Sequence, residues 1–181
     1  MFSERRFAAI LLILCAIVFL VAGMLYTGRA IWKWPAAQTY SYLIWERGSV
    51  IAAALINLMG FVLLEGVLRG AGDTIIARPA LAAYLVATAV LVAAEGSFLN
   101  SHEWVQPQII LYVVLAFLAQ AAFGLALLRT GTVPAWVGWA TIAWNLAWLV
   151  ILPIASPKDM YYPVLHHVAP LLIGIVLLAT R

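Results

Sequence analysis

Three histidines and three acids carry most of the chemistry that this sequence offers. They all lie near those ends of the apolar segments that would meet at one side of a membrane. His102 follows one apolar segment, and the adjacent pair His166 and His167 lies about one turn into the last segment. The acids near this level are Glu95, Glu103 and Asp159. Imidazole and carboxylate groups together can ligate a metal ion or pass protons. His102 and Glu95 are therefore the predicted metal ligands, and the alternative for His102 is an ordinary solvated loop.

The histidine pair and two tryptophans form a second candidate site, for a cofactor. Adjacent helical residues point about 100° apart, so only His166 or His167 can face a given site from one helix. Trp144 and Trp148 are four residues apart and share a helical face that can stack on a flat ring. These four residues are the predicted contacts of a single haem, pigment or quinone. Packing against a neighbouring helix is the alternative role of the tryptophans, and no cofactor is the default expectation.

Pro170 and three amide side chains are polar features of the apolar segments themselves. Pro170 lies four residues after His166 and has no N–H, so the helical hydrogen bond to the His166 carbonyl is missing. This leaves an acceptor open and predicts a kink. Asn57, Gln120 and Asn145 fall near the middle of three segments. We expect these amides to form hydrogen bonds across helices, and the alternative is that they line a polar path for a ligand.

Six apolar segments must position all of these residues. The chain of 181 residues is 66% hydrophobic and 9% charged, with a mean hydropathy of +1.06. A bilayer core is about 30 Å thick and takes roughly 20 helical residues, and in lipid such segments must be helices. The sequence therefore predicts an all-α polytopic membrane protein, a bundle of six transmembrane helices with short loops in a single domain, 1–181. The predicted spans are 7–26, 48–67, 79–99, 108–128, 135–155 and 162–180.

The basic residues predict how the bundle is oriented. Arg5 and Arg6 precede the first segment, and more basic residues fall on the same side as the N-terminus than on the opposite side. Positively charged loops stay in the cytoplasm, so both termini are expected there, with the histidines at the outer face. We predict a multi-pass protein of the plasma membrane, the inner membrane of a prokaryote. The outer connection 27–47 is rich in aromatic residues and is expected to lie along the membrane surface.

Glu95 is the one acid that lies inside a predicted span and close to the histidines. It precedes the end of the third segment by roughly 6 Å at about 1.5 Å per residue, so its carboxyl group can either reach water or be buried. An ionisable residue within a span is costly and is by default a candidate for function. A buried Glu95 is expected to be protonated or to pair with His166 or His167.

No catalytic signature accompanies these residues, and several classes of protein are excluded. The sequence contains no P-loop, GxSxG, HExxH or dinucleotide fingerprint and no nucleic-acid motif, so we expect neither a familiar enzyme nor a nucleic-acid partner. Cys15 is the single cysteine and cannot form an internal disulfide. The favoured function is a structural or accessory subunit of a larger membrane complex, with the bilayer and either other membrane subunits or further copies of the chain as partners. The alternatives are a haem-, pigment- or quinone-binding protein with its site on the outer face, and a small transporter or channel.

Overall fold

The computed structural model describes residues 3–103, 105–156 and 161–180, which are all-α and contain no β-strand. Five helices are long and apolar enough to cross a membrane, the first of them counted together with the π-helical turn η1, and α6 is a shorter apolar helix. In chain order the elements are α1 (Glu4–Tyr26), η1 (Thr27–Ile31), the 3-10 turn η2 (Pro35–Gln38), α2 (Tyr40–Gly70), α3 (Ala77–Ser101), α4 (Gln106–Thr130), α5 (Ala135–Ala155) and α6 (Leu165–Ala179).

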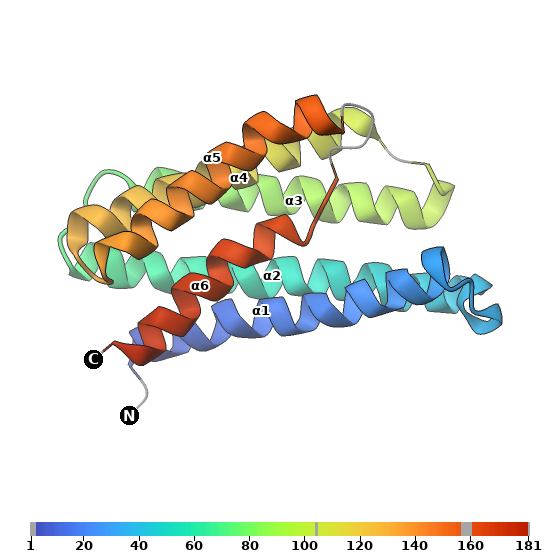
Figure 1. Cartoon of the computed structure of the whole chain (residues 1–181), viewed down its shortest axis with the longest axis horizontal. Coiled ribbons are helices and arrows are strands. Elements are labelled where there is room, and N and C mark those ends of the chain that lie inside the picture. The colour runs from blue at the N-terminus through green and yellow to red at the C-terminus, as the bar shows by residue number, and fades with distance from the viewer. Residues whose placement is uncertain (1–2, 104, 157–160, 181) are drawn as a thin grey trace.

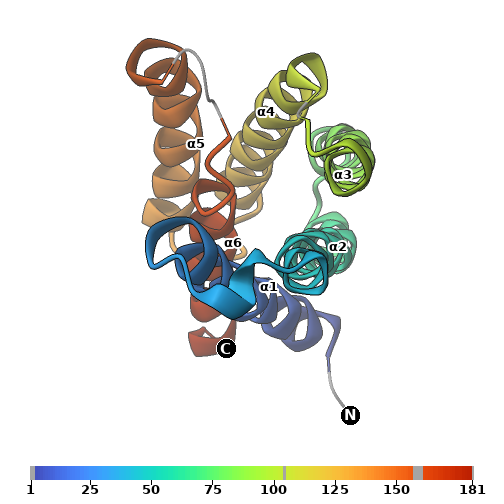
Figure 2. The ribbon, with the colours of Figure 1, turned by 90° about the vertical axis from the view of Figure 1, so that its right-hand side faces the viewer.

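The helices run up and down along the long axis of the molecule (Figure 1). The marks for the N- and C-termini lie at the same end of the bundle, and the opposite end carries η1, η2 and the last turn of α3. We call this opposite end the distal end. Viewed from there, α6 lies between α1 and α5, with α4 beside it (Figure 2). The last helix of the chain thus packs against the first one and against α5.

Side chains at the helix ends explain several of the boundaries. The Thr39 hydroxyl accepts a hydrogen bond from the Tyr42 amide at 3.4 Å and caps α2. The Asp73 carboxylate accepts from the Ile76 and Ala77 amides at 3.2 and 2.7 Å and so binds the free N–H groups at the start of α3. Gly131 ends α4 with a φ of 62°, a left-handed conformation that glycine adopts without steric cost.

The helix α2 extends well beyond the predicted span of 48–67. It begins at Tyr40, about two turns earlier, and the predicted loop 27–47 is largely helical because η1 and η2 occupy most of the rest. The early turns follow the same buried face as the later ones, through Leu43, Glu46, Arg47 and Val50. Two charged residues on that face made the segment resemble a solvated loop, whereas in the fold they are buried and paired with each other.

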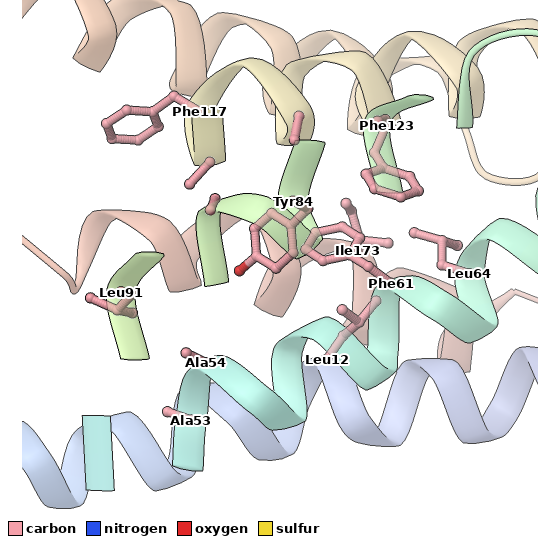
Figure 3. Close-up of a cluster of buried hydrophobic side chains, with 14 of the residues drawn as sticks. Leu12, Ala53, Ala54, Phe61, Leu64, Tyr84, Leu91, Phe117, Phe123 and Ile173 are labelled. Atoms are coloured by element: carbon pink, nitrogen blue, oxygen red, sulfur yellow. The ribbon is translucent and has the colours of Figure 1, made fainter. Parts of the chain in front are cut away.

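The core is a continuous cluster of apolar side chains from all six α-helices, part of which Figure 3 shows. Phe61 of α2 stacks on Phe123 of α4 with ring centroids 4.5 Å apart, and it also contacts Tyr84 of α3 at 4.7 Å. Leu12 of α1 and Ile173 of α6 complete the cluster and are fully buried. Aromatic pairs at such distances contribute beyond the area that they bury.

Two close contacts between helix backbones depend on glycine. A Cβ added at Gly174 of α6 would lie 2.8 Å from the Ala9 carbonyl oxygen of α1. A Cβ at Gly138 of α5 would lie 2.8 Å from the Gly124 carbonyl oxygen of α4. Small residues let helices approach closely where lipid supplies no hydrophobic force between them. These glycines therefore fix how closely α6 approaches α1 and how closely α5 approaches α4.

Candidate functional site

A group of buried charges at the distal end is the most unusual polar feature of the fold. The Arg29 guanidinium donates two hydrogen bonds to the Glu46 carboxylate, at 2.6 and 2.8 Å, in a bidentate pair. Arg47 Nη2 lies 3.1 Å from Glu46 Oε1. Glu46 is only 1% exposed and Arg47 7% exposed. We call Arg29, Glu46, Arg47, Glu95 and Tyr161 the distal charge cluster.

Glu95 joins this cluster from α3. It is fully buried, and its Oε2 atom lies 3.6 Å from Arg47 Nη1. The Tyr161 hydroxyl donates a hydrogen bond to Glu95 Oε1. The sequence predicted that a buried Glu95 would be protonated or would pair with His166 or His167, but the partners found are Arg47 and Tyr161. Phe98, one turn along α3, lies beneath the Arg47 guanidinium at 4.6 Å from the ring centroid.

Tyr161 connects the cluster to the segment that leads into α6. Its phenol acts as a hydrogen-bond donor to Glu95 of α3. The end of α3 and the start of the last segment are held together by this bond.

A cavity of about 470 Å³ lies beside the cluster, between α1, η1, α2 and residues 161–164. Its polar wall includes Glu46, Arg47 and Tyr161, and the rest of its lining is mostly apolar. Leu20 and Ile31 also line it and are 64% and 65% exposed, so the cavity opens sideways on the surface of the bundle. Its volume lies in the range that small-molecule sites occupy, roughly 300–1,000 Å³. We call it the distal cavity.

The two adjacent histidines face different neighbours, as their helical spacing requires. The His167 ring stacks on Phe19 of α1 with centroids 4.5 Å apart, and Phe19 lines the distal cavity. The His166 ring lies against Phe117 and Tyr112 of α4, at 4.1 and 4.9 Å. Neither ring nitrogen of His166 has a hydrogen-bond partner within the described part of the chain. Only His167 is therefore next to a wall of the cavity, and a cofactor role for the pair stays a prediction.

His102 is not brought into the charge cluster. It ends α3 with a left-handed φ of 61°, and its exposed ring lies 6.4 Å from the ring of Tyr40 and 6.3 Å from that of Phe98. Across 3–103, 105–156 and 161–180, no three His, Cys, Asp and Glu side chains gather where they could hold a metal ion. Asp159 lies outside the described residues. The metal role of His102 and Glu95 stays a prediction that this geometry does not support.

The two tryptophans proposed as cofactor contacts belong to α5. Trp144 and Trp148 form an edge-to-face pair with centroids 5.7 Å apart. The Trp144 indole N–H donates to the Leu165 carbonyl oxygen at 2.9 Å, which ties α5 to the first turn of α6. Trp148 packs on the apolar core. The structural role expected as the alternative accounts for both residues, and their cofactor role stays a prediction.

The predicted hydrogen bonds across helices form for two of the three amides. Gln120 Nε2 donates to the His166 carbonyl oxygen at 2.9 Å, and this is the carbonyl that Pro170 leaves without its helical donor. Asn57 Nδ2 donates to the Tyr84 hydroxyl at 2.6 Å. Asn145 differs, because its amide donates to the Thr141 carbonyl of its own helix at 2.7 Å. Structural cross-links and a polar path both fit this geometry, and the path role of Asn57, Gln120 and Asn145 stays a prediction.

Gln120→Leu is expected to lower the free energy of unfolding by about 1 kcal/mol, because the His166 carbonyl loses its donor while staying buried. Unfolding in mixed detergent micelles, followed by circular dichroism, measures this loss. In a Pro170→Ala background residue 170 regains its N–H, so the same substitution should cost clearly less. Equal costs in the two backgrounds would contradict the link between Pro170 and Gln120.

Glu46, Arg29, Arg47 and Tyr161 were not among the site residues predicted from the sequence. A signal for two of them was present, because Glu46 and Arg47 continue the three- and four-residue spacing of the buried face of α2. Arg29 and Tyr161 carry no comparable pattern. Comparisons with protein-family models, with curated proteins and with solved structures give no match to this chain.

Proposed function

We propose that this protein spans the bilayer six times with both termini in the cytoplasm, and that it binds an amphipathic molecule in the distal cavity. The N- and C-termini lie at the same end of the bundle, which supports an even number of membrane crossings (Figure 1). Arg5 and Arg6 at that end support its cytoplasmic side. The helix α6 has 15 residues and covers about 22 Å at about 1.5 Å per residue. Residues 161–164 lengthen this crossing toward the distal end.

The observation that carries the binding role is the apolar cavity with buried charges in one wall. Charged side chains inside a membrane protein are costly and mark functional sites by default. Here Glu46 and Arg47 line a cavity of ligand size whose exposed rim would face lipid. An amphipathic molecule matches both parts, with its polar end at the distal charge cluster and its apolar part leaving along α1. A quinone, one of the cofactors considered from the sequence, is a molecule of this kind.

Filling the cavity tests this role. Gly23 of α1 lines the distal cavity, and a Cβ added there would meet no atom within 4 Å. Gly23→Leu should therefore fold normally and occupy the ligand's space. We expect the wild-type protein, purified in mild detergent, to retain about one small molecule per chain by native mass spectrometry, and Gly23→Leu to retain almost none.

Gly48→Leu is the matched control for this experiment. Gly48 is on α2, does not line the cavity and also has open space at its Cβ position. The control should retain the small molecule at the wild-type level. A wild-type protein that carries no small molecule, or equal retention by wild type and Gly23→Leu, would overturn the binding role.

The proposed topology has a separate test with cysteine labels. Ser101 is exposed at the distal end of α3, whereas Thr74 is exposed at the end that carries the termini. A membrane-impermeant maleimide added to intact cells should label Ser101→Cys and spare Thr74→Cys, against the background of the buried Cys15. Labelling of Thr74→Cys alone would place the termini outside.

An accessory role in a larger membrane complex stays a prediction beside this proposal. Exposed apolar side chains on α5, among them Trp136, Trp139 and Ile154, can contact a partner subunit or another copy of the chain. Lipid covers such a surface equally well, so it favours neither arrangement. Purification of the protein alone, as a monomer, from gently solubilised native membranes would remove the accessory role.

A further inference from the structure

The charges of the described residues in the distal charge cluster balance one another. Arg29 and Arg47 contribute two positive charges, and Glu46 and Glu95 contribute two negative ones. Glu46 interacts with both arginines, and Glu95 interacts with Arg47 and Tyr161. Among the described residues, the charged wall of the cavity therefore carries no net charge.

A balanced wall discriminates between ligands by their charge. A carboxylate or phosphate head would add a third negative charge beside Glu46 and Glu95, and an ammonium head would add a third positive charge beside Arg29 and Arg47. Burying a charge that lacks an opposite partner is strongly unfavourable. A neutral head leaves the ion pairs intact and can hydrogen-bond to their outer atoms. Tyr161, held by Glu95, lies in the same wall.

We propose that the ligand of the distal cavity is electrically neutral, an amphiphile with a hydroxyl or carbonyl head and an apolar tail. This inference rests on the proposed binding role and adds the chemical class of the ligand. The head lies against Glu46, Arg47 and Tyr161, where guanidinium N–H groups can donate to it and a carboxylate can accept from it. The tail lies past Leu20 and out to the lipid.

Three probes with one tail and different head charges test this class. Hexadecanol is neutral, hexadecanoate is an anion and hexadecylammonium is a cation at neutral pH. Each is titrated into the detergent-purified full chain, and bound molecules are counted by native mass spectrometry with Gly23→Leu as the blank. We expect hexadecanol to bind at least about tenfold more tightly than either charged probe, because only these two bring an unpaired charge into the cavity.

Glu95→Gln supplies a second arm by removing one negative charge while keeping an acceptor for Tyr161. The cluster then carries one net positive charge, so hexadecanoate should gain affinity relative to hexadecanol by about tenfold. The wild-type comparison stands by itself if this variant does not fold.

The outcomes separate the class of ligand from the existence of a site. If a charged probe binds to the wild-type protein as tightly as hexadecanol, the neutral class is wrong and the binding role stands. Retention of a native ligand that carries a net charge would likewise show that the neutral class is wrong and that the binding role stands. If no probe binds above the Gly23→Leu blank and the wild-type protein retains no native molecule, the binding role itself is wrong.

Discussion

Replacing Arg47 by Met is expected to lower the free energy of unfolding by about 3–5 kcal/mol, the usual cost of removing one partner from a buried ion pair. Glu46 keeps its bidentate bond from Arg29, but Glu95 keeps only the Tyr161 hydroxyl among the partners described above. A fully buried carboxylate then lacks an opposite charge. The loss is measured as a shift in the midpoint of unfolding in mixed detergent micelles.

Two further variants show whether charge causes this loss. Arg29→Met should cost less than Arg47→Met, because the Arg29 side chain is 25% exposed and its loss leaves Glu46 with Arg47. Adding Glu95→Gln to Arg47→Met removes the unpaired carboxylate and should recover a large part of the stability. A single variant Arg47→Met within about 1 kcal/mol of wild type would show that the cluster is solvated.

Gly174→Leu is expected to destabilise the fold by about 3 kcal/mol, at the upper end of the usual cost of overpacking. Its Cβ would lie 2.8 Å from the Ala9 carbonyl oxygen and 2.9 Å from Ile13 Cγ1. The first of these atoms belongs to the α1 backbone, so the contact cannot be relieved by a rotamer change, and α1 and α6 must separate. The same unfolding assay in mixed micelles measures the loss.

Gly96→Leu is the matched control for this substitution. It also lies within a helix, but a Cβ there would meet no atom within 4 Å. Leucine has a higher helix propensity than glycine by roughly 0.5–1 kcal/mol, so this variant should be as stable as wild type or slightly more stable. If both variants lost stability equally, the cost would come from glycine replacement as such and not from the α1–α6 contact.

The helical class follows from the sequence because composition alone fixes it. Long runs of apolar residues cannot leave backbone groups unpaired in lipid, so five of the predicted segments correspond to long apolar helices. The start of α2 could not be found in this way. Its first turns contain Glu46 and Arg47. A hydropathy profile assigns two adjacent charged residues to a loop, because it does not register that they form ion pairs in the fold.

The position of the candidate site along the bundle axis could be predicted from the sequence. The interaction partner of each side chain in the site could not. Glu95 was expected near the outer histidines, but which side chain it meets depends on how α3 and α2 are rotated about their axes, and a single sequence does not record this. Asn145 shows the same limit, since it bonds to Thr141 of its own helix. Gln120 was easier, because Pro170 fixes the position of the open carbonyl in the sequence itself.

The contacts of α6 with α1, α4 and α5 have a consequence for how the chain is made. The helices are synthesised in order, so in the proposed topology α1 to α5 enter the bilayer before α6, which lies between α1 and α5, exists (Figure 2). Until α6 arrives, Gln120 has no carbonyl to bind and Ala9 has no glycine to pack against. The nascent protein must therefore wait in an open form that membrane chaperones and proteases can recognise. A stop codon shortly before Leu165 would accordingly be read by quality control as an unfinished protein and lead to its degradation.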